Sequence, residues 1–139
     1  MEAPSLRFRR QHEELMNIAA KLFPELVPAK IATDPTEARR LMARFRGLLV
    51  VHAAMENEAL YPRLLEHPRA EVRDVAKKLL AEVGSLYDGV HVHAERWSDA
   101  AAMQRDPSAF VRDTLELLKL LGRRMVRENQ ELYPLADAG

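Results

Sequence analysis

A histidine and a glutamate four residues apart are the residues of this sequence best suited to chemistry. His52 and Glu56 stand in the segment His-Ala-Ala-Met-Glu-Asn-Glu-Ala-Leu-Tyr-Pro, residues 52–62. On a helix, side chains at positions i and i+4 lie on one face, where a single cation can bridge them. Imidazole with carboxylate is typical of iron or manganese sites and possible for zinc. Calcium is excluded, because nitrogen is a poor ligand for it.

The same segment occurs a second time, 72 residues further along the chain and without a gap. Residues 124–134 read Arg-Met-Val-Arg-Glu-Asn-Gln-Glu-Leu-Tyr-Pro, so Arg124 takes the place of His52 and Glu128 that of Glu56. Two matching helices are therefore predicted. One presents a histidine and a glutamate, and the other an arginine and a glutamate.

Composition and charge narrow the class of protein. A chain of 139 residues predicts a single domain over positions 1–139. Lys and Arg total 21, as do Asp and Glu, which argues against a nucleic-acid or anionic-membrane partner. Cysteine is absent, so disulfides and thiolate metal sites are excluded. No apolar run approaches the roughly 20 residues of a membrane span, and the N-terminus lacks an apolar signal core. A soluble, cytoplasmic protein is expected.

Apolar residues recur at helical spacing in four stretches, and no stretch alternates with the period of two that strands require. Helices are predicted near 6–22, 35–65, 69–98 and 107–134. Their starts follow from Ser5 as a cap and from two Asp-Pro pairs at 34–35 and 106–107, again 72 residues apart. The Pro-rich connection 24–35 is expected to be irregular. Such helices bury their stripes best as an all-α, antiparallel up-down four-helix bundle.

Six polar residues interrupt the apolar stripes: His12, His52, Glu56, Glu82, Arg124 and Glu128. At a rise of about 1.5 Å per residue, an up-down bundle places them within about one turn of the same height. One buried layer of two imidazoles, three carboxylates and a guanidinium is therefore predicted. Burying such charges is costly unless they pair or bind a metal ion.

The positions of these residues resemble the hemerythrin-like, or HHE cation-binding, family over nearly the whole chain. The resemblance lies in His12, in His52-x-x-x-Glu56-x-x-x-Leu-Tyr-Pro and in Glu128-x-x-x-Leu-Tyr-Pro. It implies a four-helix bundle with a carboxylate-bridged di-iron centre for oxygen binding, iron handling, or sensing of oxygen or nitric oxide. The Glu-x-x-His spacing of ferritin-type di-iron bundles does not occur in the sequence.

By this resemblance, His12 and His52 are imidazole ligands of the metal, and Glu56 and Glu128 are the bridging carboxylates. Two positions depart from the family pattern. The histidine of the fourth helix is replaced by Arg124, which cannot ligate a metal. The histidine of the third helix falls near Glu82, a weaker match that could still be a ligand.

A five-histidine oxygen carrier is therefore excluded, and two hypotheses remain. In the first, non-haem iron, as one ion or a degenerate pair, is held by His12, His52, Glu56, Glu128 and Glu82, with dioxygen or nitric oxide as the ligand. In the second, Arg124 and the carboxylates replace the metal, and the chain is a metal-free helical regulatory or interaction module. No catalytic residue is assigned, since no substrate pocket or proton-transfer pair is evident. Binding or sensing is predicted rather than turnover, and a small oxidase has no specific support.

The other notable side chains have structural interpretations. His91 and His93 are predicted to be surface histidines of the third helix, near Trp97. Tyr61 and Tyr133 each stand at the end of a helix, as amphipathic plugs whose hydroxyls should find a hydrogen-bond partner.

Overall fold

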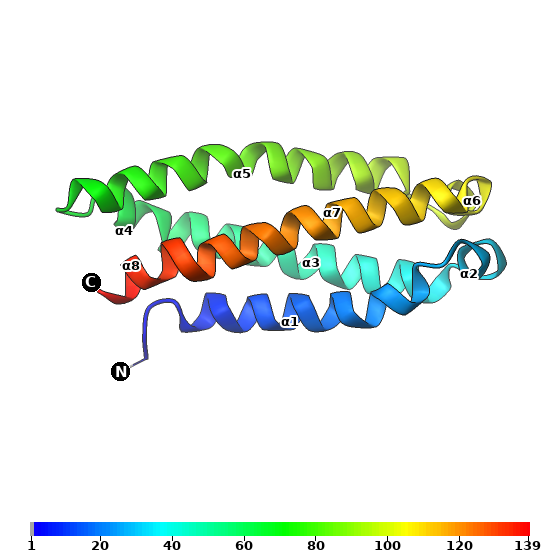
Figure 1. Ribbon diagram of the computed structural model, residues 1–139, viewed down its shortest axis with the longest axis horizontal. Helices are drawn as coiled ribbons and strands as arrows, with labels where there is room; N and C mark the ends of the chain where they lie inside the picture. The colour runs from blue at the N-terminus through cyan, green and yellow to red at the C-terminus, as the bar shows by residue number, and fades with distance from the viewer. Residues whose placement is uncertain (1) are drawn as a thin grey trace.

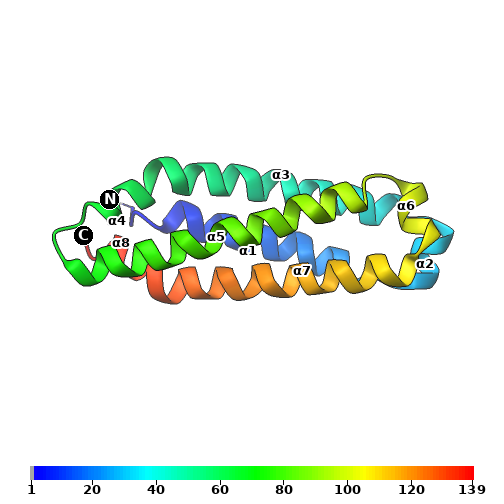
Figure 2. The same ribbon diagram turned by 90° about the horizontal axis from the view of Figure 1, so that it is seen from above.

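The computed structural model describes residues 2–139, in which four long helices run alternately up and down (Figure 1). These are α1 (Leu6–Leu22), α3 (Thr36–Ala59), α5 (Ala70–Arg96) and α7 (Pro107–Arg127). Turning the molecule by 90° shows the four helices packed around one long axis (Figure 2). No strand occurs among the described residues. The predicted all-α, antiparallel four-helix bundle is confirmed.

Shorter helices connect and end the long ones. The connection between α1 and α3 holds a 3-10 turn, η1 (Phe23–Glu25), and α2 (Pro28–Thr33), while α6 (Ala100–Arg105) precedes α7. The prediction of an irregular 24–35 connection is therefore wrong. Pro24 and Pro28 stand in the first turn of these two helices, where a missing N–H costs nothing.

The helix starts follow the predicted signals in part. Asp106 caps α7 as expected, because its Oδ1 accepts a hydrogen bond from the Ala109 amide at 3.1 Å. Ser5 does not cap α1. Its amide and hydroxyl instead donate to the Asp137 carboxylate, at 2.9 and 2.6 Å, and so tie the two ends of the chain together.

The two Leu-Tyr-Pro segments end their helices in different ways. In the first, α3 stops at Ala59 and a short α4 (Tyr61–Leu65) follows. In the second, α7 passes into a π-helical turn, η2 (Glu128–Leu132), and then into α8 (Tyr133–Asp137). Proline removes the N–H of the regular i to i−4 bond, so each helix must change its course at this point.

The apolar core consists of two clusters with a polar layer between them. The larger cluster includes Leu15, Phe45 and Leu118, and the smaller one, nearer the chain ends, includes Phe8 and Tyr133. Five of the six predicted layer residues are buried between these clusters: His12, His52, Glu56, Arg124 and Glu128. Within residues 2–139 no helix has both the length and the apolar stretch needed to cross a membrane.

The prediction that His93 lies on the surface is wrong, whereas His91 is exposed as expected. His93 is only 6% exposed, and its Nε2 lies 2.8 Å from Thr114 Oγ1. It stands three residues after the buried Val90 on the core-facing stripe of α5, and this position decides its burial.

Burial lowers the pKa of His93 to about 4, with Arg46 and Arg96 acting in the same direction and Asp113 against it. A buried histidine that stays neutral stabilises the fold above its unfolded pKa near 6.5. This contribution is lost as the pH falls from 6.5 toward 4.

The His93→Gln variant keeps a polar group for Thr114 but cannot titrate. In urea unfolding, the free energy of unfolding of wild type should therefore fall by about 2 kcal/mol more than that of the variant between pH 7 and pH 4.5. Equal losses in the two proteins would contradict this account of His93.

Candidate metal centre

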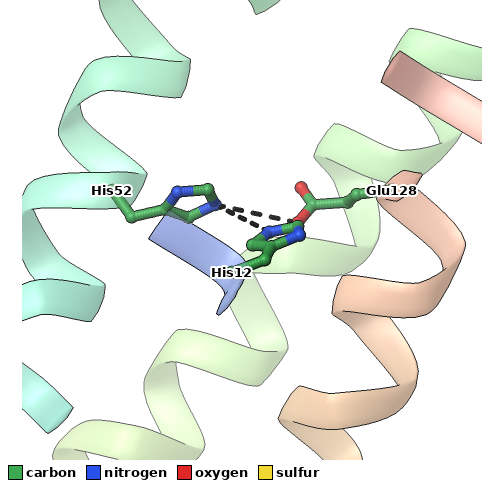
Figure 3. A group of neighbouring side chains, drawn as sticks. All are labelled: His12, His52 and Glu128. Carbon is green, nitrogen blue, oxygen red and sulfur yellow. Dashed lines mark hydrogen bonds and ion pairs between the residues drawn. The ribbon is translucent and has the colours of Figure 1, made fainter. Parts of the chain in front are cut away.

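Three side chains from three helices bring their ligand atoms to one point inside the bundle (Figure 3). His12 comes from α1, His52 from α3 and Glu128 from the start of η2. The His12 Nε2 atom lies 3.1 Å from His52 Nε2 and 3.1 Å from Glu128 Oε1. The third separation, from His52 Nε2 to Glu128 Oε1, is 3.9 Å. All three residues are at most 3% exposed, so bulk water does not screen them.

The far nitrogen of each imidazole is held by a side-chain amide. His12 Nδ1 lies 2.9 Å from Asn129 Oδ1, and His52 Nδ1 lies 2.6 Å from Gln11 Oε1. A carbonyl oxygen can only accept, so both Nδ1 atoms carry the hydrogen and both Nε2 atoms present a lone pair. Two lone pairs 3.1 Å apart repel unless a proton or a cation lies between them.

The surrounding carboxylates favour that positive charge. Burial works against protonation of His52, but hydrogen bonds and charges from Glu128 and Glu56 outweigh it and raise the pKa of His52 to about 9. Burial also works to raise the pKa of Glu128. The contacts of Glu128 with the His12 and His52 imidazoles and the charge of Arg124 overcome this effect and hold that pKa at about 2. In the metal-free molecule at neutral pH, a proton on His52 therefore stands where a cation would bind.

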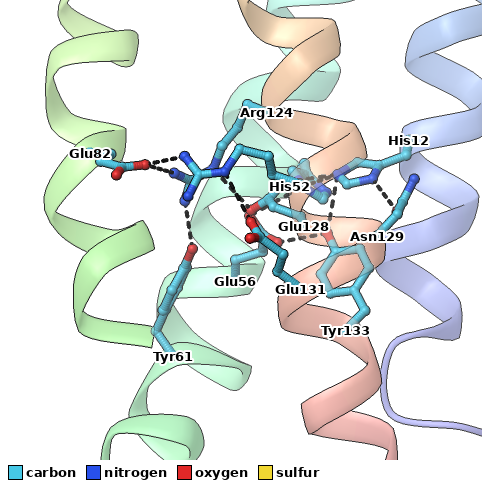
Figure 4. A network of polar contacts seen from close by, with 11 residues as sticks. His12, His52, Glu56, Tyr61, Glu82, Arg124, Glu128, Asn129, Glu131 and Tyr133 are labelled. Carbon is cyan, nitrogen blue, oxygen red and sulfur yellow. Dashed lines mark hydrogen bonds and ion pairs between the residues drawn. The ribbon is translucent and has the colours of Figure 1, made fainter. Parts of the chain in front are cut away.

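Glu56 and Tyr133 adjoin the three ligand atoms (Figure 4). Glu56 Oε1 lies 3.2 Å from His52 Nε2, and its Oε2 accepts a hydrogen bond of 2.7 Å from the Tyr133 hydroxyl. The same hydroxyl is 3.1 Å from His12 Nε2. Burial raises the pKa of both Glu56 and Tyr133, so the phenol keeps its proton and remains a donor.

Arg124 lies beside the centre and does not fill it. Its Nη2 donates to the Tyr61 hydroxyl at 2.7 Å, and its Nε lies 3.6 Å from Glu128 Oε2. The two oxygens of Glu128 are thus divided, with Oε1 toward the histidines and Oε2 toward the guanidinium. The prediction that each helix-end tyrosine hydroxyl finds a hydrogen-bond partner is confirmed, and the partners are Arg124 for Tyr61 and Glu56 for Tyr133.

The prediction that Glu82 belongs to the buried layer is wrong. Its side chain is 41% exposed and forms an ion pair with Arg127, while its carboxylate stays 3.9 Å from Arg124 Nη1. The hydrogen bond from Arg127 lowers the pKa of Glu82. A charged group that finds a counter-ion at the surface avoids the cost of burial, and similar height along the bundle did not make this side chain point inward.

Sequence reasoning missed Gln11 and Asn129, which hold the two histidines. Both residues directly adjoin a predicted ligand, Gln11 before His12 and Asn129 after Glu128. One signal was present, because the Glu-Asn pair at 128–129 repeats the pair at 56–57.

Comparison with known families bears directly on this centre. A family model for the hemerythrin HHE cation-binding domain matches residues 4–136. The chain belongs to this family. No curated protein and no solved structure shows a match to it. The cation that the family name implies would meet Nε2 of His12 and His52 and Oε1 of Glu128, the group whose ligand atoms lie within 4.8 Å of one another.

The donor set of this hemerythrin-family chain fits a cation. Ligand bonds of about 2.1 Å at right angles place neighbouring donor atoms about 3 Å apart. Two of the three separations here are 3.1 Å, and the third is 3.9 Å. Two imidazoles whose outer nitrogens are held by hydrogen bonds, together with one carboxylate, are a donor set that divalent transition metals accept.

The stabilisation of protonated His52 by its neighbouring carboxylates can be tested in protein freed of metal with a chelator. Its raised pKa stabilises the fold below pH 6.5, and this contribution is lost as the pH rises through about 9. The Glu128→Gln variant removes a carboxylate charge from His52, so an NMR titration should show the His52 pKa fall by about one unit or more. The exposed Glu82→Gln variant is the matched control and should leave it near 9. An unchanged His52 pKa in Glu128→Gln would show that Glu128 does not stabilise the imidazolium.

Proposed function

We propose that this hemerythrin-family chain binds one non-haem iron ion in the bundle core. The ligands are Nε2 of His12, Nε2 of His52 and Oε1 of Glu128, with Glu56 as the adjoining carboxylate. The observation that carries the proposal is the convergence of two Nδ1-protonated imidazoles and an ionised carboxylate on one buried point. Iron is favoured over the hard oxygen-bound cations because two of the three donors are nitrogen.

The charge of the layer supports one ion rather than two. Glu56 and Glu128 carry two negative charges when ionised, and Arg124 carries one positive charge. Glu82 lies 3.9 Å from Arg124 but pairs with Arg127 at the surface, so its charge is balanced outside the layer. Once a divalent ion has displaced the proton from His52, one ion leaves the group at plus one, whereas two ions would leave plus three beside a guanidinium.

The proposed role is binding or sensing of dioxygen or nitric oxide, or the handling of iron itself. Iron, when bound, supplies open coordination positions for a diatomic ligand. The chain excludes water from these positions with the apolar clusters on either side, and it keeps the Tyr133 hydroxyl protonated beside His12. The alternative of a metal-free module would require Arg124 to take the metal's place. Its contacts with Tyr61 and Glu128 Oε2 support a charge-balancing role instead.

Metal analysis tests this proposal most directly. Untagged protein from iron-supplemented medium should carry up to one iron per chain, with an electronic spectrum that changes on exposure to nitric oxide. His52→Ala and Glu128→Ala should each lose the metal, because loss of one of three ligands lowers affinity at least about 100-fold. The controls Glu82→Ala and His91→Ala alter exposed side chains and should keep it. A metal content no higher than background in wild type would refute the proposal. Full retention of the metal in His52→Ala would also refute it.

Arg124→His tests the role of the guanidinium. This change removes a positive charge and restores on α7 the histidine and glutamate spacing that α3 carries at 52 and 56. We expect metal content to rise above one per chain. We also expect metal-free stability to fall by about 1–3 kcal/mol, because Glu128 loses a buried counter-ion. Elemental analysis and urea unfolding in the presence of a chelator measure the two effects. If neither quantity changes, Arg124 has no charge-balancing role.

A further inference from the structure

A groove of about 450 Å³ lies between α1 and α7 and reaches one ligand of the candidate centre, His12. His12 and Asn129 line it, together with the outer side chains Glu13, Met16 and Val126. A larger cavity, of about 670 Å³, lies at the end of the bundle near the chain termini, and no ligand or amide of the centre lines it. Of these two cavities, the α1–α7 groove is therefore the one that reaches a ligand of the centre.

We propose that this groove is the route by which a hydrated divalent cation and water reach and leave the centre, and that the His12–Asn129 pair is the part that moves. The inference rests on the proposed metal site. His12, His52 and Glu128 are each at most 3% exposed, so an ion cannot arrive without displacing a side chain. His12 is the ligand that lines the groove, and its partner Asn129 is half-buried there.

The contacts of Asn129 allow its side chain to move while its backbone stays in place. Arg9 Nη2 donates to the Asn129 carbonyl oxygen at 3.2 Å, and the same guanidinium lies over the Tyr133 ring, 5.3 Å from its centre. The side-chain oxygen of Asn129 is held by the hydrogen bond to His12 Nδ1. Breaking that bond frees the amide. For the His12 ring to turn toward the groove, its Nε2 must also leave His52, Glu128 and the Tyr133 hydroxyl, each 3.1 Å away (Figure 4).

The groove is polar and close to neutral, because its wall carries one guanidinium, Arg9, and one carboxylate, Glu13. Glu13 and Asn17 offer oxygen atoms in its wall, and both are exposed. Oxygen donors of this kind hold hard cations together with their water. At about 30 Å³ per water molecule, the volume has room for roughly ten or more of them. The apolar part of the wall includes Met16 and Val126, each 50% exposed.

Gly122 keeps the groove wide. It stands within α7, and a Cβ atom added there would meet nothing within 4 Å. Its counterpart in the 72-residue repeat is Val50, so this helix position does not itself require glycine. Glycine inside a helix costs about 1 kcal/mol relative to alanine. A large side chain at position 122 would project into the groove and narrow it.

The test compares Gly122→Phe with Gly47→Phe. Gly47 is exposed within α3, has the same free space around its Cβ and lines neither cavity. The two variants therefore carry the same change in helix propensity and surface hydrophobicity. With Co²⁺ as an optical probe, stopped-flow loading and chelator-driven release should both slow about tenfold in Gly122→Phe. The Co²⁺ dissociation constant should stay unchanged, because a narrower path raises the barrier equally in both directions. Gly47→Phe should match wild type.

A second measurement needs no metal. Diethyl pyrocarbonate should modify His12 in metal-free wild type, as mapped by peptide mass spectrometry, and should do so about tenfold more slowly in Gly122→Phe. If Gly122→Phe takes up Co²⁺ and is modified at His12 as fast as wild type, the groove is not the route. The proposal also fails if the Co²⁺ dissociation constant of Gly122→Phe changes while its rate of His12 modification stays at the wild-type value. If wild type binds no metal, the proposed function fails, and the modification of His12 alone then decides whether the groove is the path to the centre.

Discussion

Two imidazole nitrogens that each present a lone pair, 3.1 Å apart in the dry core, are the constraint on which this structure depends. Gln11 and Asn129 hold the opposite nitrogens as donors, so the lone pairs cannot turn away. Positive charge must lie between them, and Glu128 stabilises it. Proton and metal ion therefore compete for one position, and metal affinity must depend on pH as long as His52 is the group that yields the proton.

The 72-residue repeat places two chemically different side chains, His52 and Arg124, at matching positions of two helices. Each Leu-Tyr-Pro tyrosine reaches across to the other half. Tyr61 accepts a hydrogen bond from Arg124, and Tyr133 donates one to Glu56. The two contacts differ in direction and in position, and the halves differ in charge, because a guanidinium stands where the other half has an imidazole. At this one repeat position, the first half thus has a nitrogen donor, His52, and the second has a fixed positive charge, Arg124.

Helical spacing and caps were sufficient to predict the four long helices, and shared height along the bundle was sufficient to bring His12, His52 and Glu128 together. The same reasoning failed for Glu82 because height does not determine the direction of a side chain around the helix axis. His93 was misplaced for the opposite reason, since its polarity was given more weight than its position on the buried stripe of α5. The amide of Asn129 has no signature of its own and becomes meaningful only once His12 is beside it.

The place of the polar layer between two apolar clusters sets opposing demands. Excluding water strengthens every charge interaction in the layer, yet it also closes the layer to ions from solvent. Both requirements can be satisfied between α1 and α7. There His12 lines a groove, and its amide partner Asn129 is half-buried. His52 and Glu128 can stay fixed by their neighbours while His12 turns. A centre built this way keeps a preorganised pair of donors and adds the third as the ion arrives, which reconciles a dry site with exchange.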